Sequence, residues 1–190
     1  CRAYEVKKGE SQKAVDDCIR KITGEFKVGK FIQYSKVKQL YRYILERFQR
    51  VEQDRTAHKK KVGIVGEIYV KFSPLGNNNL EDFLLSEGAE PVLPGLMDFV
   101  LYCIYNSVLD YQLYGRSKKS AVLYKFAYNF VLKKQRDIIA AIRQHGMFDA
   151  PQYFDDVRKK AADIISPGVK MGEGWLLPAE MVELISEGVN

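Results

Sequence analysis

The sequence predicts a helix-rich α/β fold with a short parallel sheet of the flavodoxin or Rossmann type and an inserted helical subdomain. A run of strand-forming residues over 62–70 is followed by a loop, an apolar-periodic helix and a second short apolar run. Longer segments on both sides of this unit repeat apolar residues at helical spacing. At 190 residues the chain can bury one substantial core.

We expect two parts in the chain. Residues 1–57 are predicted to form a helical lead-in, and residues 58–190 an α/β domain with its helical insertion at about 96–165. Because the chain begins at Cys1 and not at Met, we also expect it to be an excised fragment of a longer protein.

The lead-in carries two amphipathic patterns. Apolar residues recur on one helical face over 10–23 and again over 37–51. Ser35 stands where it could cap the second helix. The basic segment AHKKK, residues 57–61, is expected to connect this part to the first strand.

The α/β unit follows directly. A strand over 62–70, a loop with Pro74 and Gly76, a helix at about 78–87 and a strand near 91–93 form one strand–helix–strand sequence. Such a unit predicts two parallel strands joined by a right-handed crossover.

The helical insertion begins with a segment that is apolar on nearly every side. Residues 97–114 are therefore expected to be covered all round and to pack against a long helix over 117–145, with Cys103 in the core. A third helix is expected over 151–165, before Ser-Pro-Gly.

Two distant segments are nearly identical. FLLSEG, residues 83–88, and ELISEG, residues 183–188, each end a predicted helix, the second of which starts near Pro178. A strand follows the first of them. We therefore expect a strand to begin after the second as well, where this sequence stops.

The candidate ligand- or partner-binding residues lie in three loops. The helices at 78–87 and 178–187 should both begin at the carboxyl edge of the sheet, where open α/β sheets bind ligands. The candidates are Gly66, Glu67, Asn77, Asn78, Asn79, Gly172, Glu173, Gly174 and Trp175.

Each loop has a simpler interpretation too. Glu67 could be a solvated carboxylate at a strand end, and one or more of the asparagines a plain helix cap. The Gly-Glu-Gly-Trp loop could be a tight turn with Trp175 in the core.

Composition limits the function classes. A net charge of +6 and a pI of about 9.1 come without a nucleic-acid recognition motif, and no apolar run of about twenty residues is present. The three cysteines, Cys1, Cys18 and Cys103, lack metal-site spacing, so we expect inert thiols, no metal site and a reducing cytoplasmic setting. Two distant histidines support no catalytic triad, and we predict no catalytic residue.

Three segments carry a family resemblance: RAYEVKKGES (2–11), KVGIVGEIYVKFSPLGNNNLEDFLLSEGAEPVLPGLMDFVLYCIYN (61–106) and GEGWLLPAEMVELISEGVN (172–190). They resemble the acyl-CoA dehydratase activase-related proteins, which are similar to the activator of (R)-2-hydroxyglutaryl-CoA dehydratase. The matched part is the dehydratase-like region of that family.

The resemblance implies a role in ATP-dependent, low-potential electron transfer in anaerobic metabolism. It implies an ATPase module and iron–sulfur clusters in the full-length parent, and a dehydratase as a possible partner. Glu67 stands where related dehydratase subunits have a cluster-binding cysteine, so the fragment is expected to be non-catalytic and without its own cofactor. The alternative is a small-ligand or acyl-CoA binding module that uses the basic segment 57–61 and helix N-termini.

Overall fold

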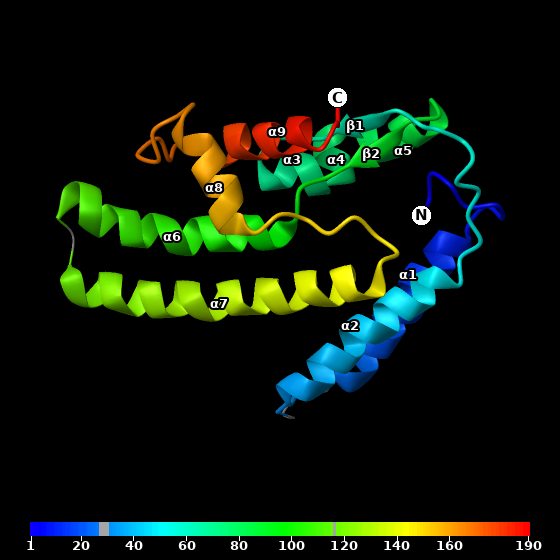
Figure 1. The fold of residues 1–190 in the computed structure, drawn as a ribbon, viewed down its shortest axis with the longest axis horizontal. Coiled ribbons are helices and arrows are strands. Elements are labelled where there is room, and N and C mark those ends of the chain that lie inside the picture. Colours follow the sequence, from blue (N-terminus) through cyan, green and yellow to red (C-terminus); the bar gives the residue numbers. More distant parts are fainter. Residues whose placement is uncertain (27–30, 116) are drawn as a thin grey trace. The chain divides into compact units, whose positions relative to one another are not determined.

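The computed structural model describes residues 1–26, 31–115 and 117–190, and most of them are helical. The chain folds as two compact units (Figure 1). The first unit comprises Cys1–Lys59 and Ala140–Ala150, and the second Lys60–Ile139 and Pro151–Asn190.

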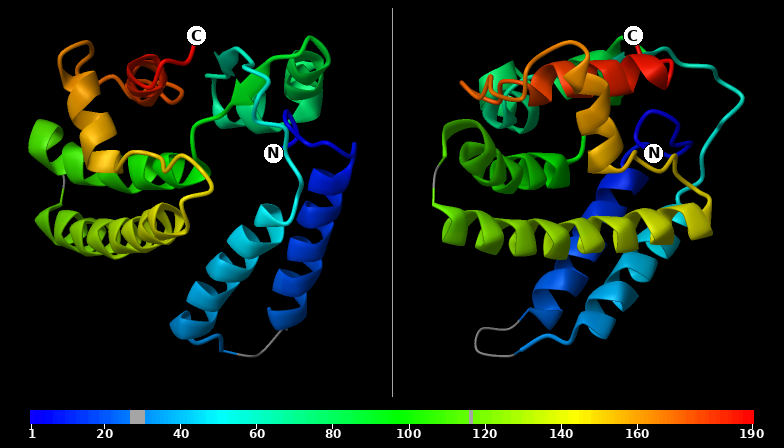
Figure 2. Two further views of the ribbon diagram at one scale, coloured as in Figure 1. Left: turned by 45° about the vertical axis from the view of Figure 1, so that its right-hand side comes forward. Right: turned by 60° about the vertical axis from the view of Figure 1, so that its left-hand side comes forward.

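The first unit is a helical hairpin. Its helices α1 (Glu10–Glu25) and α2 (Tyr34–Gln49) lie side by side in each view of Figures 1 and 2. Between them, the Arg47 Nε atom donates to the Asp17 Oδ2 atom at 2.8 Å. The two predicted amphipathic helices are thus confirmed, but the predicted cap is wrong. Gln33 holds the cap position of α2 in an extended conformation, and Ser35 lies inside the helix.

The second unit contains the sheet and the remaining helices. Its elements are β1 (Lys61–Gly63), α3 (Ile68–Phe72), α4 (Pro74–Asn77), α5 (Leu80–Ser86), β2 (Glu90–Val92), α6 (Leu96–Tyr114), α7 (Lys118–His145), α8 (Phe154–Ala162) and α9 (Leu176–Ser186). From Ala140 onward, α7 belongs to the first unit.

The sheet is parallel and short. β1 and β2 pair with Lys61 opposite Glu90 and Gly63 opposite Val92, and α5 lies between them in the chain. The predicted strand–helix–strand unit is present, but the predicted strand over 62–70 is wrong. The chain leaves the sheet after Ile64 and turns into α3, whose Lys71 is buried against α9, so this segment does not follow its local strand propensity.

The two nearly identical segments fold in the same way. Gly88 and Gly188 have φ values of +79° and +74°, which glycine adopts without strain. After α5, the Ala89 N–H donates to the Leu84 carbonyl at 3.0 Å, and after α9 the Val189 N–H donates to the Leu184 carbonyl at 3.0 Å. Both helices therefore end with the same glycine-dependent turn.

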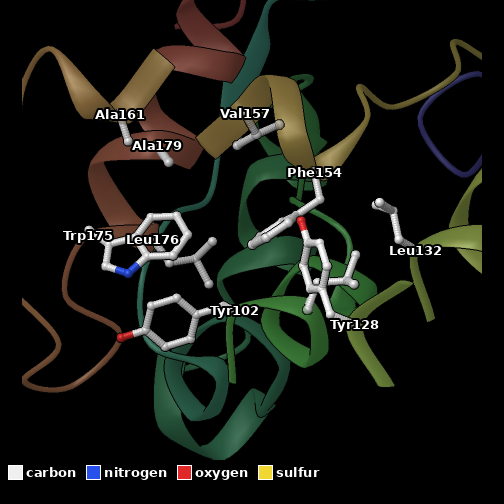
Figure 3. Close-up of a cluster of buried hydrophobic side chains, with 10 residues drawn as sticks. Tyr102, Tyr128, Leu132, Phe154, Val157, Ala161, Trp175, Leu176 and Ala179 are labelled. Atoms are coloured by element: carbon white, nitrogen blue, oxygen red, sulfur yellow. The ribbon is translucent and has the colours of Figure 1, made fainter. Parts of the chain in front are cut away.

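The main core lies among α6, α7, α8 and α9. Figure 3 shows the aromatic rings of Tyr102, Tyr128, Phe154 and Trp175 gathered at its centre. The Tyr102 and Trp175 ring centroids are 5.1 Å apart, and those of Phe154 and Trp175 are 6.0 Å apart. Aromatic residues make up 12% of the chain, and several of them pack together where these four helices meet.

One face of α6 is not covered. Leu101 and Tyr102 are buried, whereas Leu113 and Tyr114 are 48% and 63% exposed. Cys103 is also exposed, so its predicted place in the core is wrong. Neighbouring helices contact one side of α6, and its apolar composition alone could not show which side remains open. Among the residues that the structure describes, no helix has both the length and the apolar character to cross a membrane.

The composition of this core predicts that two phenylalanines contribute very differently to the free energy of unfolding. Phe154 is fully buried and Phe126 on α7 is 73% exposed. Replacing Phe154 with Ala should lower the free energy of unfolding by about 3–5 kcal/mol, because a cavity forms among aromatic rings. Phe126→Ala should change it by less than about 0.5 kcal/mol. Denaturant unfolding followed by Trp175 fluorescence measures both, and equal losses would contradict this core.

Candidate functional site

Glu67 ends the connection that leaves the carboxyl end of β1. The Ile64 N–H still donates to the Val92 carbonyl at 2.9 Å, so the ladder continues one residue past β1. The chain then turns, and Glu67 precedes the first residue of α3 with its side chain exposed. The Glu67 carbonyl accepts the Lys71 N–H at 2.9 Å. Glu67 is therefore a solvent-facing carboxylate at the carboxyl edge of the sheet.

The Gly172–Trp175 loop lies against the Glu67 loop. A Cβ atom at Gly172 would collide with the Glu67 Oε1 atom, and the Glu173 Oε1 atom accepts the Ile68 N–H. Gly172 also has a φ of +60°, which disfavours other residues. The expectation that these two loops border the same edge of the sheet agrees with this geometry.

Glu173 is the more unusual of the two carboxylates. Its side chain is largely buried, at 4% exposure for the residue. One carboxylate oxygen accepts the Ile68 N–H, and the other is buried with no hydrogen-bond partner among the residues that the structure describes. Burying a carboxylate oxygen without a hydrogen-bond partner costs free energy.

Gly174 and Trp175 have structural roles. A Cβ atom at Gly174 would collide with the Val169 carbonyl, so only glycine fits this turn. Trp175 is 1% exposed, and its Nε1 atom donates to the Asn106 Oδ1 atom at 3.1 Å. The simpler interpretation, a tight turn with the tryptophan in the core, describes these two residues.

The three consecutive asparagines have separate structural tasks. The Asn77 Nδ2 atom donates to the Val70 carbonyl at 2.9 Å, and its Oδ1 atom accepts the Leu80 N–H at 3.2 Å. Asn78 and Asn79 have φ values of +54° and +55°, in the left-handed region that asparagine tolerates better than most residues. Asn79 precedes α5 without a side-chain capping bond. Turn geometry thus explains why three asparagines occur here.

A buried charged cluster lies behind these loops and was not predicted from the sequence. The Lys71 Nζ atom donates to both oxygens of Glu180, at 2.6 and 2.8 Å, and their side chains are 1% and 0% exposed. Asp98 and Glu183 are buried as well. The Asp98 Oδ1 atom accepts the Gln135 Nε2–H at 2.7 Å. The cluster connects α3, α6, α7 and α9.

Sequence signals for this cluster were weak. Lys71 is the charged residue in IYVKF, and Glu180 and Glu183 are three residues apart on α9, so they share a helical face. That spacing is equally typical of a solvent-exposed stripe. Only the packing of α3 against α9 distinguishes the two interpretations.

Burial changes the acidity of the cluster. Loss of solvation raises the pKa of Asp98 to about 6, opposed by its hydrogen bond from Gln135 and the charge of Lys71. Loss of solvation raises the pKa of Glu183 to about 7, and the negative charge of Asp98 adds to the rise. The pKa of Glu180 is also raised by burial, against the opposing effect of Lys71. The Lys71 ammonium therefore opposes the effect of burial at Glu180 and Asp98, whereas no cation offsets it at Glu183 among the causes of its raised pKa.

Comparison with family models, with curated proteins and with solved structures yields no match for this chain.

The raised pKa of Glu183 predicts how the free energy of unfolding depends on pH. Its folded pKa of about 7 lies above the ordinary value of 4.5, so the folded state holds a proton that the unfolded state releases. This contribution is fully present below pH 4.5 and is lost as pH rises through about 7. The parent chain should therefore lose unfolding free energy between about pH 5 and 8. Over the same range, Glu183→Gln should lose about 1–3 kcal/mol less.

The control for Glu183 is Glu87→Gln, since Glu87 is an exposed glutamate at the end of α5 and is not among the groups that shift the pKa of Glu183. Urea unfolding followed by Trp175 fluorescence at several pH values measures the slope. Identical slopes for the parent chain and Glu183→Gln would contradict the assignment.

The ion pair gives a second prediction. Lys71→Met leaves the Glu180 carboxylate buried without its ammonium partner and should cost about 3–5 kcal/mol of unfolding free energy. Replacing both partners, Lys71→Met with Glu180→Leu, should recover most of that loss because no buried charge then lacks a partner. Denaturant unfolding of the two single variants and the double variant tests this. Additive losses would show that the two side chains do not interact.

Proposed function

We propose that this chain is a non-catalytic, partner-docking module of a protein similar to the activators of 2-hydroxyacyl-CoA dehydratases. Its role would lie in ATP-dependent, low-potential electron transfer to an iron–sulfur dehydratase or reductase in the cytoplasm. The observation that carries the proposal is spatial. The two longest segments of the family resemblance, 61–106 and 172–190, meet where Glu67 lies against Gly172 and Glu173 binds the Ile68 N–H.

The fold supports a docking face at this place. β1, α5 and β2 form a parallel strand–helix–strand unit of the kind from which flavodoxin-like sheets are built. In such sheets, ligands and partners bind outside the carboxyl ends of the strands. Glu67 is exposed at that edge, and the buried Lys71–Glu180 pair anchors the helix that follows it.

The residues at this edge do not fit an iron–sulfur cluster. Such clusters are held by cysteine thiolates, four in the common types. Cys103 lies on α6 in the second unit, whereas Cys1 and Cys18 belong to the first. The side chains around Ile68 are instead the carboxylates of Glu67 and Glu173. We therefore assign clusters and ATP binding to other modules of the proposed parent protein.

Acyl-CoA binding at this edge is less well supported. The basic residues Lys60 and Lys61 precede or begin β1, so they lie toward the amino edge of the sheet. Glu67 and Glu173 place negative charge at the carboxyl edge, and Lys71 is paired with Glu180. The phosphates of CoA would be repelled there, whereas a protein surface with basic residues would be attracted.

Direct binding measurements test the docking proposal. The chain is immobilised anaerobically and titrated with an ATPase activator and with an iron–sulfur 2-hydroxyacyl-CoA dehydratase from the same organism. We expect one of them to bind, and Glu67→Lys should weaken that binding about tenfold or more by reversing an exposed charge in the interface.

The matched control is Glu87→Lys. Glu87 is also an exposed glutamate, but it lies in the turn before β2, at the amino edge of the sheet. Its reversal should leave binding unchanged. Failure of both proteins to bind would overturn the docking function, and equal weakening by both variants would exclude the carboxyl edge as the interface.

A further inference from the structure

The last residue of the chain is hydrogen-bonded to β1. The Asn190 N–H donates to the Lys61 carbonyl at 3.1 Å, and the Gly63 N–H donates to the Asn190 carbonyl at 2.8 Å. Two such bonds on either side of Val62 are the pattern of neighbouring parallel strands. Figure 1 shows the C-terminus beside β1, next to the end of α9.

β2 occupies the other side of β1. The Glu90 N–H donates to the Lys60 carbonyl at 2.8 Å, and the Ile64 N–H donates to the Val92 carbonyl at 2.9 Å. Lys60 and Ile64, which flank β1, thus bond to β2, and Lys61 and Gly63 bond to Asn190. β1 therefore has the hydrogen-bonding pattern of an interior strand.

Packing holds the C-terminal residues in this position. A Cβ atom at Gly63 would lie 2.8 Å from the Leu184 Cδ1 atom and 3.4 Å from the Val189 Cγ1 atom. Val189 is 5% exposed. The absence of a side chain at Gly63 lets α9 and Val189 approach β1 closely, so the pairing is supported by burial as well as by hydrogen bonds.

We propose that this edge of β1 receives an extended segment that runs parallel to it, with Asn190 as the first paired residue. This is strand addition, in which backbone hydrogen bonds supply the affinity and the register. The inference goes beyond the docking function and does not depend on it. Because α9 covers one face and parallel strands are commonly buried on both faces, the segment should be rich in β-branched apolar residues.

The register follows from the two observed bonds. The second residue after Asn190 should donate its N–H to the Gly63 carbonyl and accept the Val65 N–H. The first residue after Asn190 should direct its N–H away from β1. Continued to the end of β1, the segment arrives at the carboxyl edge, where Glu67 lies.

Proline substitution can test this register. The segment Ile-Val-Ile-Thr is attached after Asn190, and two further variants carry proline at its first or at its second position. Proline has no N–H, so only the second position should disrupt the ladder, since the first bonds to nothing on β1. Hydrogen exchange of the Val65 amide and unfolding followed by Trp175 fluorescence are measured for all three and for the chain ending at Asn190.

The expected result separates the two proline variants. The all-strand segment and the variant with proline at the first position should slow exchange of the Val65 amide about tenfold or more and raise the unfolding midpoint. The variant with proline at the second position should behave like the chain that ends at Asn190. Equal behaviour of the two proline variants, or fast Val65 exchange with every segment, would overturn the proposal.

Discussion

The buried ion pair between Lys71 and Glu180 is the interaction on which the second unit depends most. Its two partners come from the short helix α3 and from α9, which are more than one hundred residues apart in the chain. A pair of this kind contributes little net stability, but removing one partner is costly. It therefore specifies one arrangement of α3 on α9, and with it the position of the loop that carries Glu67.

The fixed position of α3 has consequences on both sides of the sheet. On one side it brings Glu67 and Gly172 together at the carboxyl edge, where the exposed carboxylate supports a docking role. On the other it leaves α9 packed over Gly63, so that Val189 and Asn190 reach β1. The same packing thus shapes a candidate interaction face and a sheet edge that can accept another strand.

Much of the candidate site could be placed from the sequence. The order of the strand–helix–strand unit, together with the near-repeat of FLLSEG and ELISEG, predicted that the Glu67 and Gly172 loops share an edge, because helices that return the chain to parallel strands begin at that edge. What the residues do there was not predictable. The three asparagines were candidate ligand- or partner-binding residues, yet two adopt left-handed turns and Asn77 bridges α3 and α5.

The sequence by itself determined the local elements, namely the helices and the two parallel strands on either side of α5. It also determined where four of the helices end, at the glycines 88, 115, 146 and 188. These follow from periodicity and from the freedom of glycine to adopt positive φ, which act within a few residues. Only the tertiary structure decided that residues 68–72 form a helix despite strand-forming side chains, that Cys103 is exposed, and that Glu180 and Glu183 are buried. The reason is physical: burial and charge pairing depend on which faces of distant segments meet, and helical spacing alone does not distinguish a buried polar stripe from an exposed one.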